Sequence, residues 1–106
     1  MKKNVGIFIF DEAEVLDFAG PFEVFSVTSQ LQDDSLFNVF TVAKNKTVIK
    51  AVNGLQVMPD YSFTDHPEIH ILIIAGGQGT RKLLNDLETL HWVKQVHAAS
   101  EYTLSI

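Results

Sequence analysis

Two continuous runs of apolar, strand-forming residues constrain the fold of this chain more than any other feature. The first is VGIFIF, from Val5 to Phe10, and the second lies in IHILIIA, from Ile69 to Ala75, where it is unbroken from Ile71 onward. A strand with one wet face alternates apolar and polar residues, whereas an unbroken apolar run predicts a strand buried on both faces, as in a parallel sheet. We therefore predict an α/β protein in which helices cross between parallel strands.

The region between the two runs supplies a helix, a strand and a hairpin. Apolar residues recur at helical spacing over residues 15–31, and Gly20-Pro21 predicts a kink or a restart within that stretch. Residues 37–43 (FNVFTVA) predict a second strand. Asn53-Gly54 stands between extended runs at 48–52 and 55–58, and this pattern is a strong hairpin signal.

The last third of the chain predicts a helix followed by a strand. Asn85 or Asp86 can cap the helix, and Glu88 stands three residues after Asn85, in capping-box spacing. Its apolar stripe comprises Leu87, Leu90, Val93, Val96 and Ala99, or their neighbours. Residues 102–106 then form a strand. The complete order predicts a flavodoxin-like three-layer α/β sandwich with a mostly parallel sheet and a small β-hairpin.

Composition excludes several functions. The 106 residues carry a formal net charge of -5 with eight Lys plus Arg, and no basic run is longer than the pair Lys2-Lys3. We therefore expect no nucleic-acid partner for this segment and no anionic membrane partner. There is no cysteine, so no disulfide or thiol chemistry can arise within these residues. The N-terminus does not resemble a signal peptide, and we expect a soluble, cytoplasmic protein.

A glycine-rich turn follows the second apolar run. In AGGQGT, from Ala75 to Thr80, backbone N–H groups can face an anion or a developing oxyanion, or the glycines can simply make a tight turn. The turn is not a Walker loop, because no Gly-Lys-Ser/Thr closes it. It is not a dinucleotide fingerprint either, because Lys82 stands where the third glycine should be.

Four acids follow the first run at the same predicted end of the sheet: Asp11, Glu12, Glu14 and Asp17. Acids in such a loop commonly complement a helix N-terminus. Asp17 differs because it lies between Leu16 and Phe18, and a carboxylate in an apolar setting near a cleft is a candidate for orienting a water or holding a proton. The pattern leaves both interpretations open.

The histidines do not predict a metal centre. DHPEIH, from Asp65 to His70, lacks the adjacent His-Glu pair of a helical zinc motif, and Pro67 places it in a loop. His91 and His97 lie six positions apart and fall on different faces of the predicted helix. We expect neither a metal nor a cofactor.

Three segments together resemble the ThiJ/PfpI superfamily, within the class I glutamine amidotransferase-like fold. The resemblance is strongest to the branch that holds isonitrile hydratases and the ligand domains of AraC-type regulators. The segments are LDFAGPFEVF (residues 16–25), NGLQVMPDYSF (53–63) and ILIIAGGQGTRKLLND (71–86), with Ala75 where proline is commoner. The resemblance covers nearly the whole chain.

This resemblance implies a set of site residues. A nucleophile-elbow cysteine is expected immediately after Ile106, which makes residues 1–106 the N-terminal part of a single ThiJ/PfpI-type domain. Asp17 would hydrogen-bond the thiol or a reacting water, and the Gly77 N–H would form half of an oxyanion hole. Gly76, Gln78, Gly79 and Thr80 would contact a small-molecule substrate. The family also implies a homodimer.

Several functions follow from the resemblance. The first is a cysteine-dependent hydratase or hydrolase, of which the isonitrile hydratase version adds water to give an N-substituted formamide. The second is a non-catalytic ligand-sensing domain of an AraC-type regulator, and a protease, an amidase or a glyoxalase are further alternatives. Asp17 favours an enzyme, because a pure binding pocket does not require a carboxylate there. A complete 106-residue protein, or a chain interrupted at a modified residue, is the remaining alternative.

Overall fold

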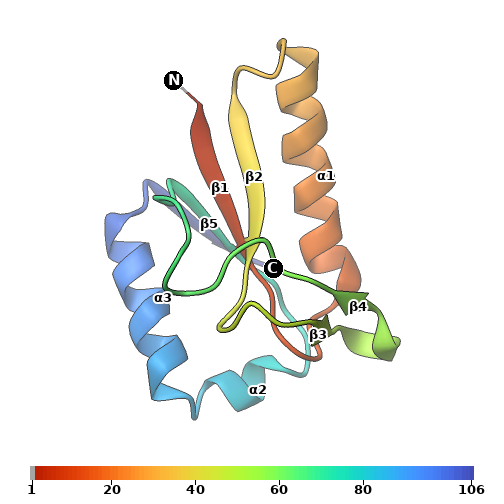
Figure 1. Cartoon of the computed structure of the whole chain (residues 1–106), viewed down its shortest axis with the longest axis vertical. Coiled ribbons are helices and arrows are strands. Elements are labelled where there is room, and N and C mark those ends of the chain that lie inside the picture. Colours follow the sequence, from red (N-terminus) through yellow and green to blue (C-terminus); the bar gives the residue numbers. More distant parts are fainter. Residues whose placement is uncertain (1) are drawn as a thin grey trace.

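The computed structural model describes residues 2–106 and shows a three-layer α/β arrangement (Figure 1). Four parallel strands form the central sheet: β1 (Lys3–Phe8), β2 (Phe37–Val42), β5 (Ile71–Ile74) and β6 (Tyr102–Ser105). Their order in the sheet is β2-β1-β5-β6, and every neighbouring pair is parallel. A separate antiparallel hairpin consists of β3 (Ile49–Lys50) and β4 (Gln56–Val57). The predicted fold class is confirmed.

Helices lie on the two sides of the sheet (Figure 1). They are α1 (Val15–Leu31) on one side and α3 (Leu87–Ala99) on the other, with the single turn α2 (Thr80–Leu83) near the carboxyl ends of the strands. A short 3₁₀ turn, Val52–Gly54, joins the two strands of the hairpin, where Asn53-Gly54 predicted it. None of the helices in residues 2–106 is both long and apolar enough to cross a bilayer.

The central position of β1 explains the unbroken apolar run that begins at Val5. Alternate side chains of a strand face opposite sides of a sheet, and both sides of β1 are covered. Phe8 faces α3, where its ring centroid lies 5.3 Å from that of Trp92. Val5 and Ile7 point the other way, and both are fully buried. A polar residue at any of these positions would be buried without water.

Helix α1 runs through Gly20-Pro21 without interruption, so the restart predicted as one alternative there does not occur. A single helix runs from Val15 through Pro21 to Leu31. Pro21 removes one hydrogen bond, to the carbonyl four residues earlier. The helix continues because apolar contacts hold it on both sides of the proline. Phe18 is buried before it, and Phe25 packs edge-on against Phe37 at 5.0 Å after it.

Helix α3 uses Asp86 as its N-cap, and the capping-box pair predicted from Asn85 does not form. The Asp86 carboxylate accepts hydrogen bonds from the Thr89 N–H and the Thr89 hydroxyl. The buried face consists of Thr89, Trp92 and Val96, while Leu87 is 80% exposed. Two polar residues can lie on this face because each is satisfied, Thr89 by Asp86 and the Trp92 indole N–H by His66 Nε2 at 3.0 Å.

The turn from α1 to β2 depends on one buried hydroxyl. Ser29 is 1% exposed, and its Oγ accepts the Phe37 N–H at 3.1 Å while lying 3.0 Å from Asp34 Oδ1. We predict that Ser29→Ala destabilises the protein by about 1–3 kcal/mol, because the Phe37 N–H loses its acceptor. Urea denaturation measures this change. Ser26→Ala, one turn earlier on the same helix, is the matched control and should leave stability nearly unchanged, and an equal loss in both variants would contradict the prediction.

Candidate functional site

The loop between β1 and α1 is bonded to the glycine turn that follows β5. The Glu14 N–H donates to the Gly76 carbonyl at 3.0 Å, and the Gly79 N–H donates to the Glu12 carbonyl at 3.4 Å. Glu12 has a φ of 66°. This left-handed conformation is uncommon outside glycine, and such residues cluster at functional sites. Because parallel strands end at one edge, the two loops meet where ligands bind in open α/β sheets.

The hairpin is attached to the same loop. The Glu12 N–H donates to the Lys50 carbonyl at 2.7 Å, and the Val52 N–H donates to the Ala13 carbonyl at 2.9 Å. Asp11 Oδ1 also accepts the Lys50 N–H at 2.9 Å. The loop after β1, the glycine turn after β5 and the hairpin are distant in sequence, and hydrogen bonds that involve mainly backbone groups hold them together.

Asp17 lies in the first turn of α1 and reaches this junction. Its Oδ2 accepts the Gly76 N–H at 3.1 Å, and its side chain is partly exposed. The Ile106 N–H continues the ladder by donating to the Ile74 carbonyl at 3.1 Å. A Cβ built on Gly76 would lie 2.5 Å from the Ile106 carbonyl oxygen and 2.9 Å from Asp17 Oδ2. Position 76 must therefore be glycine if Asp17 and Ile106 are both to approach it.

Gly77 supplies a backbone donor without a protein partner. Its φ is 124°, a conformation that side chains disfavour. A Cβ there would also lie 2.6 Å from the Glu12 carbonyl oxygen. Within residues 2–106, the Gly77 N–H has no hydrogen-bond acceptor. A free N–H beside a carboxylate can bind a developing negative charge.

The other predicted substrate-binding residues occupy different environments. Gly76 is partly exposed and Gln78 is exposed, whereas Gly79 is buried against Phe10. The Thr80 hydroxyl donates to the Gly77 carbonyl at 2.8 Å and so holds the turn from inside. Substrate contact by these four residues stays a prediction.

Two cavities lie beside the turn. One, of about 330 Å³, is lined by Glu12, Gln78 and the hairpin residues from Lys50 to Gly54. The other, of about 240 Å³, has Gly79 and Lys82 on one wall and the segment after β2 on another. Neither is lined by Asp17.

Ion pairs fix the charges around the second cavity. Lys82 Nζ lies 3.0 Å from Glu12 Oε2, and Lys44 Nζ lies 2.8 Å from Asp86 Oδ2. The hydrogen bond from Lys44, followed by that from the Thr89 side chain, lowers the pKa of Asp86 below its usual range. The same contact with Asp86 raises the pKa of Lys44. Both groups of the Lys44–Asp86 pair are therefore charged at neutral pH.

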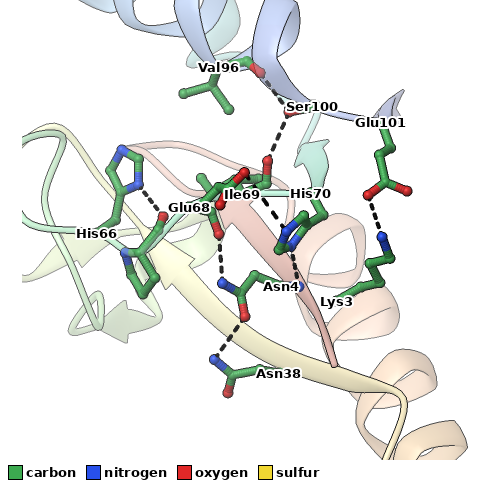
Figure 2. Close-up of polar contacts among 11 residues, drawn as sticks. Lys3, Asn4, Asn38, His66, Glu68, Ile69, His70, Val96, Ser100 and Glu101 are labelled. Atoms are coloured by element: carbon green, nitrogen blue, oxygen red, sulfur yellow. Dashed lines mark hydrogen bonds and ion pairs between the residues drawn. The ribbon is translucent and has the colours of Figure 1, made fainter. Parts of the chain in front are cut away.

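His66 and His70 lie at the opposite, amino end of the sheet and serve as hydrogen-bond partners there (Figure 2). His70 Nδ1 accepts the Asn4 N–H at 2.8 Å. His66 Nδ1 donates to the Pro67 carbonyl at 2.7 Å, while its Nε2 accepts from Trp92. In the described part of the chain, no group of three His, Cys, Asp or Glu side chains has metal-binding geometry.

The sequence placed Glu12 at this end of the sheet but did not predict its contacts, and it did not predict any role for Lys50 or Lys44. Glu12 and Lys50 act mainly through backbone groups, which no side-chain pattern reports. Lys44 pairs with a residue 42 positions later. Glu12 and Lys44 carry one sequence signal, which is that they follow predicted strands, as Asp17 and the glycines do. Lys50 lies within the predicted hairpin.

The chain belongs to the DJ-1/PfpI family, whose pattern matches residues 3–106.

Two curated relatives carry different functions. An isonitrile hydratase from Pseudomonas putida is 27% identical over 106 residues, which are the whole of this chain and 44% of the relative. The HTH-type transcriptional regulator GbdR from Pseudomonas aeruginosa is 24% identical over 80 residues, which are 76% of this chain and 22% of the regulator. The chain thus spans less than half the length of both relatives.

A solved structure supports the fold. A ThiJ/PfpI family protein from Pseudomonas syringae superposes with a TM-score of 0.81 at 22% identity, over 99% of this chain and 42% of that one. At this identity the likeness is one of fold.

We predict that Gly77→Ala destabilises the protein by at least about 2 kcal/mol, because it adds φ strain and an overlap with the Glu12 carbonyl. Gly20→Ala is the control. A Cβ on Gly20 meets nothing within 4 Å, so alanine in this helical position should be neutral or stabilising by up to about 1 kcal/mol. Urea denaturation of both variants measures the difference, and equal stabilities would refute this description of the turn.

The lowered pKa of Asp86 predicts a loss of stability in acid. A carboxyl group with a depressed folded-state pKa contributes stability above its unfolded pKa, near 3.9, and loses it as the pH falls through the folded value. Melting temperatures measured from pH 6 downward should therefore fall more steeply for the wild type than for Asp86→Asn in this acidic range. Glu23→Gln, an exposed acid on α1, should keep the wild-type slope, and a wild-type slope in Asp86→Asn would contradict the prediction.

Proposed function

We propose that this chain is the N-terminal part of a cysteine-dependent hydratase or hydrolase that acts on a small molecule. The observation that carries the proposal is the contact between Asp17 and the Gly76 N–H, next to the free N–H of Gly77 and the end of β6. A cysteine that follows Ile106 would enter beside Asp17. The 27% identity to an isonitrile hydratase over the full chain supports an isonitrile as the substrate.

The arrangement of Asp17 suits proton transfer. The Gly76 N–H holds Oδ2, and within residues 2–106 the other oxygen, Oδ1, has no hydrogen-bond partner. A carboxylate held by one oxygen keeps a fixed orientation and can accept a proton with the other. In the proposed reaction, Oδ1 takes the proton of the thiol or of a water, and the thiolate is the nucleophile.

The overall reaction adds one water to the isonitrile carbon and involves no oxidation. One water hydrogen ends on carbon and the other on nitrogen, while the water oxygen becomes the carbonyl oxygen of an N-substituted formamide. The thiolate adds to the isonitrile carbon while that carbon takes the proton held by Asp17, which gives a thioimidate. Water then adds to the thioimidate carbon as its nitrogen takes a proton, and the C–S bond breaks to release the thiolate as the carbonyl forms. Negative charge develops on the water-derived oxygen when its hydroxyl loses the proton in this last step. The Gly77 N–H is the donor that would stabilise it.

A ligand-sensing domain is the second candidate. The match to an HTH-type transcriptional regulator supports it, as does the cavity between Gln78 and the hairpin. In a sensor the same pocket would bind a small molecule without converting it. Turnover therefore separates the two functions, and binding alone does not.

The decisive experiment uses the complete gene product, including whatever follows Ile106. Conversion of an alkyl isonitrile to the N-alkylformamide is followed by proton NMR. We predict that Asp17→Asn lowers kcat/KM by about 10²–10⁴-fold, the usual contribution of a general acid or base. Glu14→Gln is the matched control from the same loop and should retain activity.

Each remaining outcome has a defined meaning. Unchanged turnover in Asp17→Asn would remove Asp17 from the mechanism. A wild-type protein that binds isonitriles but releases no formamide would favour the sensor. Release of an amine from an amide would instead favour an amidase. Formation of lactate from methylglyoxal would favour a glyoxalase.

A further inference from the structure

One cavity lies directly beside the Gly77 turn. Its volume is about 330 Å³, and Gln78, the residue that follows Gly77 in the chain, forms part of its lining. Consecutive Cα atoms lie about 3.8 Å apart, so the cavity begins within one residue of the candidate oxyanion site. A molecule that reacts between Asp17 and Gly77 would therefore have this cavity within reach of its unreactive part.

The hairpin is a fixed wall of the cavity. It lies at the end of the sheet where α1 begins (Figure 1). The Lys50 carbonyl accepts the Glu12 N–H at 2.7 Å, and the Lys50 N–H donates to Asp11 Oδ1 at 2.9 Å. The Val52 N–H donates to the Ala13 carbonyl at 2.9 Å. Because both β3 and the 3₁₀ turn are bonded to the loop after β1, the wall keeps a constant position relative to the glycine turn.

Two side-chain amides on the lining are free to bind a ligand. Asn53 comes from the hairpin turn and Gln78 from the glycine turn, so the two amides belong to different walls. Both residues are exposed, and within residues 2–106 neither side-chain amide has a hydrogen-bond partner. An amide carries donors as well as an acceptor. The pair therefore suits a neutral group that both donates and accepts, such as a hydroxyl.

The charges around the cavity cancel. Glu12 and Lys50 belong to the lining. Asp11 bonds to the Lys50 N–H, and Lys82 Nζ lies 3.0 Å from Glu12 Oε2. Two acids and two lysines give a formal sum of zero, so the surroundings select neither an anion nor a cation. The side-chain amides are then the groups that can discriminate among ligands.

We propose that this cavity selects the substituent of the small molecule, and that Asn53 and Gln78 favour a substituent with a hydroxyl group. The inference rests on the proposed function, in either its hydratase or its sensor form, because it places the reacting group at Asp17 and Gly77. In the isonitrile reaction the substituent is the group on nitrogen, which the reaction leaves unchanged. One hydrogen bond between uncharged groups corresponds to about a two- to tenfold gain in affinity.

N-(3-hydroxypropyl)formamide is the test ligand, because its binding can be followed whether or not the complete gene product is catalytically active. N-butylformamide and N-(3-aminopropyl)formamide have the same number of heavy atoms and replace the hydroxyl by a methyl and an ammonium group. Affinities come from amide shifts of the ¹⁵N-labelled complete gene product. We expect the hydroxypropyl compound to bind about two- to tenfold more tightly than the butyl compound, and the aminopropyl compound to gain nothing over butyl. The shifted amides should include Asn53 and Gln78.

Variants identify the contribution of the two amides. Asn53→Gly and Gln78→Ala should each lower the preference for the hydroxypropyl compound and leave the affinity for N-butylformamide nearly unchanged. Glycine is chosen at position 53 because it adopts the φ of 67° found there without strain. Gln56→Ala is the matched control, because Gln56 is an exposed amide on β4 of the same hairpin and does not line the cavity. It should keep the wild-type preference.

The outcomes separate this inference from the proposed function when isonitrile turnover is measured on the same preparation. A hydroxyl preference supports the inference, with turnover in an enzyme and without turnover in a sensor. Equal wild-type affinities for the hydroxypropyl and butyl compounds would overturn the inference even if turnover is present, as would an equal loss of preference in Gln56→Ala and Gln78→Ala. Absence of both turnover and formamide binding would remove the inference together with the proposed function. The wild-type comparison decides the question even if a variant fails to fold.

Discussion

The burial of β1 between two parallel neighbours is the constraint on which the rest of the structure depends. Residues 5–8 of this strand pair with β2 on one side and with β5 on the other. A strand enclosed in this way has no edge and no wet face, so its sequence must be apolar throughout. Its direction also fixes where the chain must emerge. The loop after β1, the glycine turn after β5 and the end of β6 leave the sheet at one edge.

At that edge, hydrogen bonds between closely spaced backbone segments hold the structure together, rather than hydrophobic packing. The acidic loop, the hairpin and the glycine turn are joined by main-chain hydrogen bonds at 2.7–3.4 Å. Such contacts leave no space for a Cβ at Gly76 or Gly77. The carboxylate of Asp17 and the N–H of Gly77 are thus positioned by backbone groups that take no part in a reaction themselves. This division between a rigid frame and a few reactive groups is common in α/β proteins.

The sequence predicted the helices and strands because its apolar residues recur at clear strand and helix spacings. Unbroken apolar runs identified β1 and β5, and Asn53-Gly54 identified the hairpin turn. The helix restart allowed for at Pro21 does not occur, because packing of Phe18 and Phe25 outweighs one missing hydrogen bond. The buried face of α3 differed because Thr89 and Trp92 find partners, Asp86 and His66, that only the folded chain brings near.

For the candidate site, the position of a residue was predictable but its partners were not. Asp17 and the glycine turn could be placed at one edge from strand direction alone. That Asp17 accepts the Gly76 N–H depends on how the loop after β1 meets the glycine turn, and no residue pattern specifies that contact. The left-handed Glu12 and the pairing of Lys44 with Asp86 likewise arise from tertiary contacts.

The packing around Trp92 gives the molecule an internal optical reporter. It is the single tryptophan among the 106 residues, and it stacks on Phe63 at 4.2 Å while contacting Phe8 at 5.3 Å. A buried indole emits at shorter wavelength than one in water. Because Phe8 also borders the cavity near Lys44, the emission of one side chain reports both on the integrity of the core and on the inner wall of that cavity.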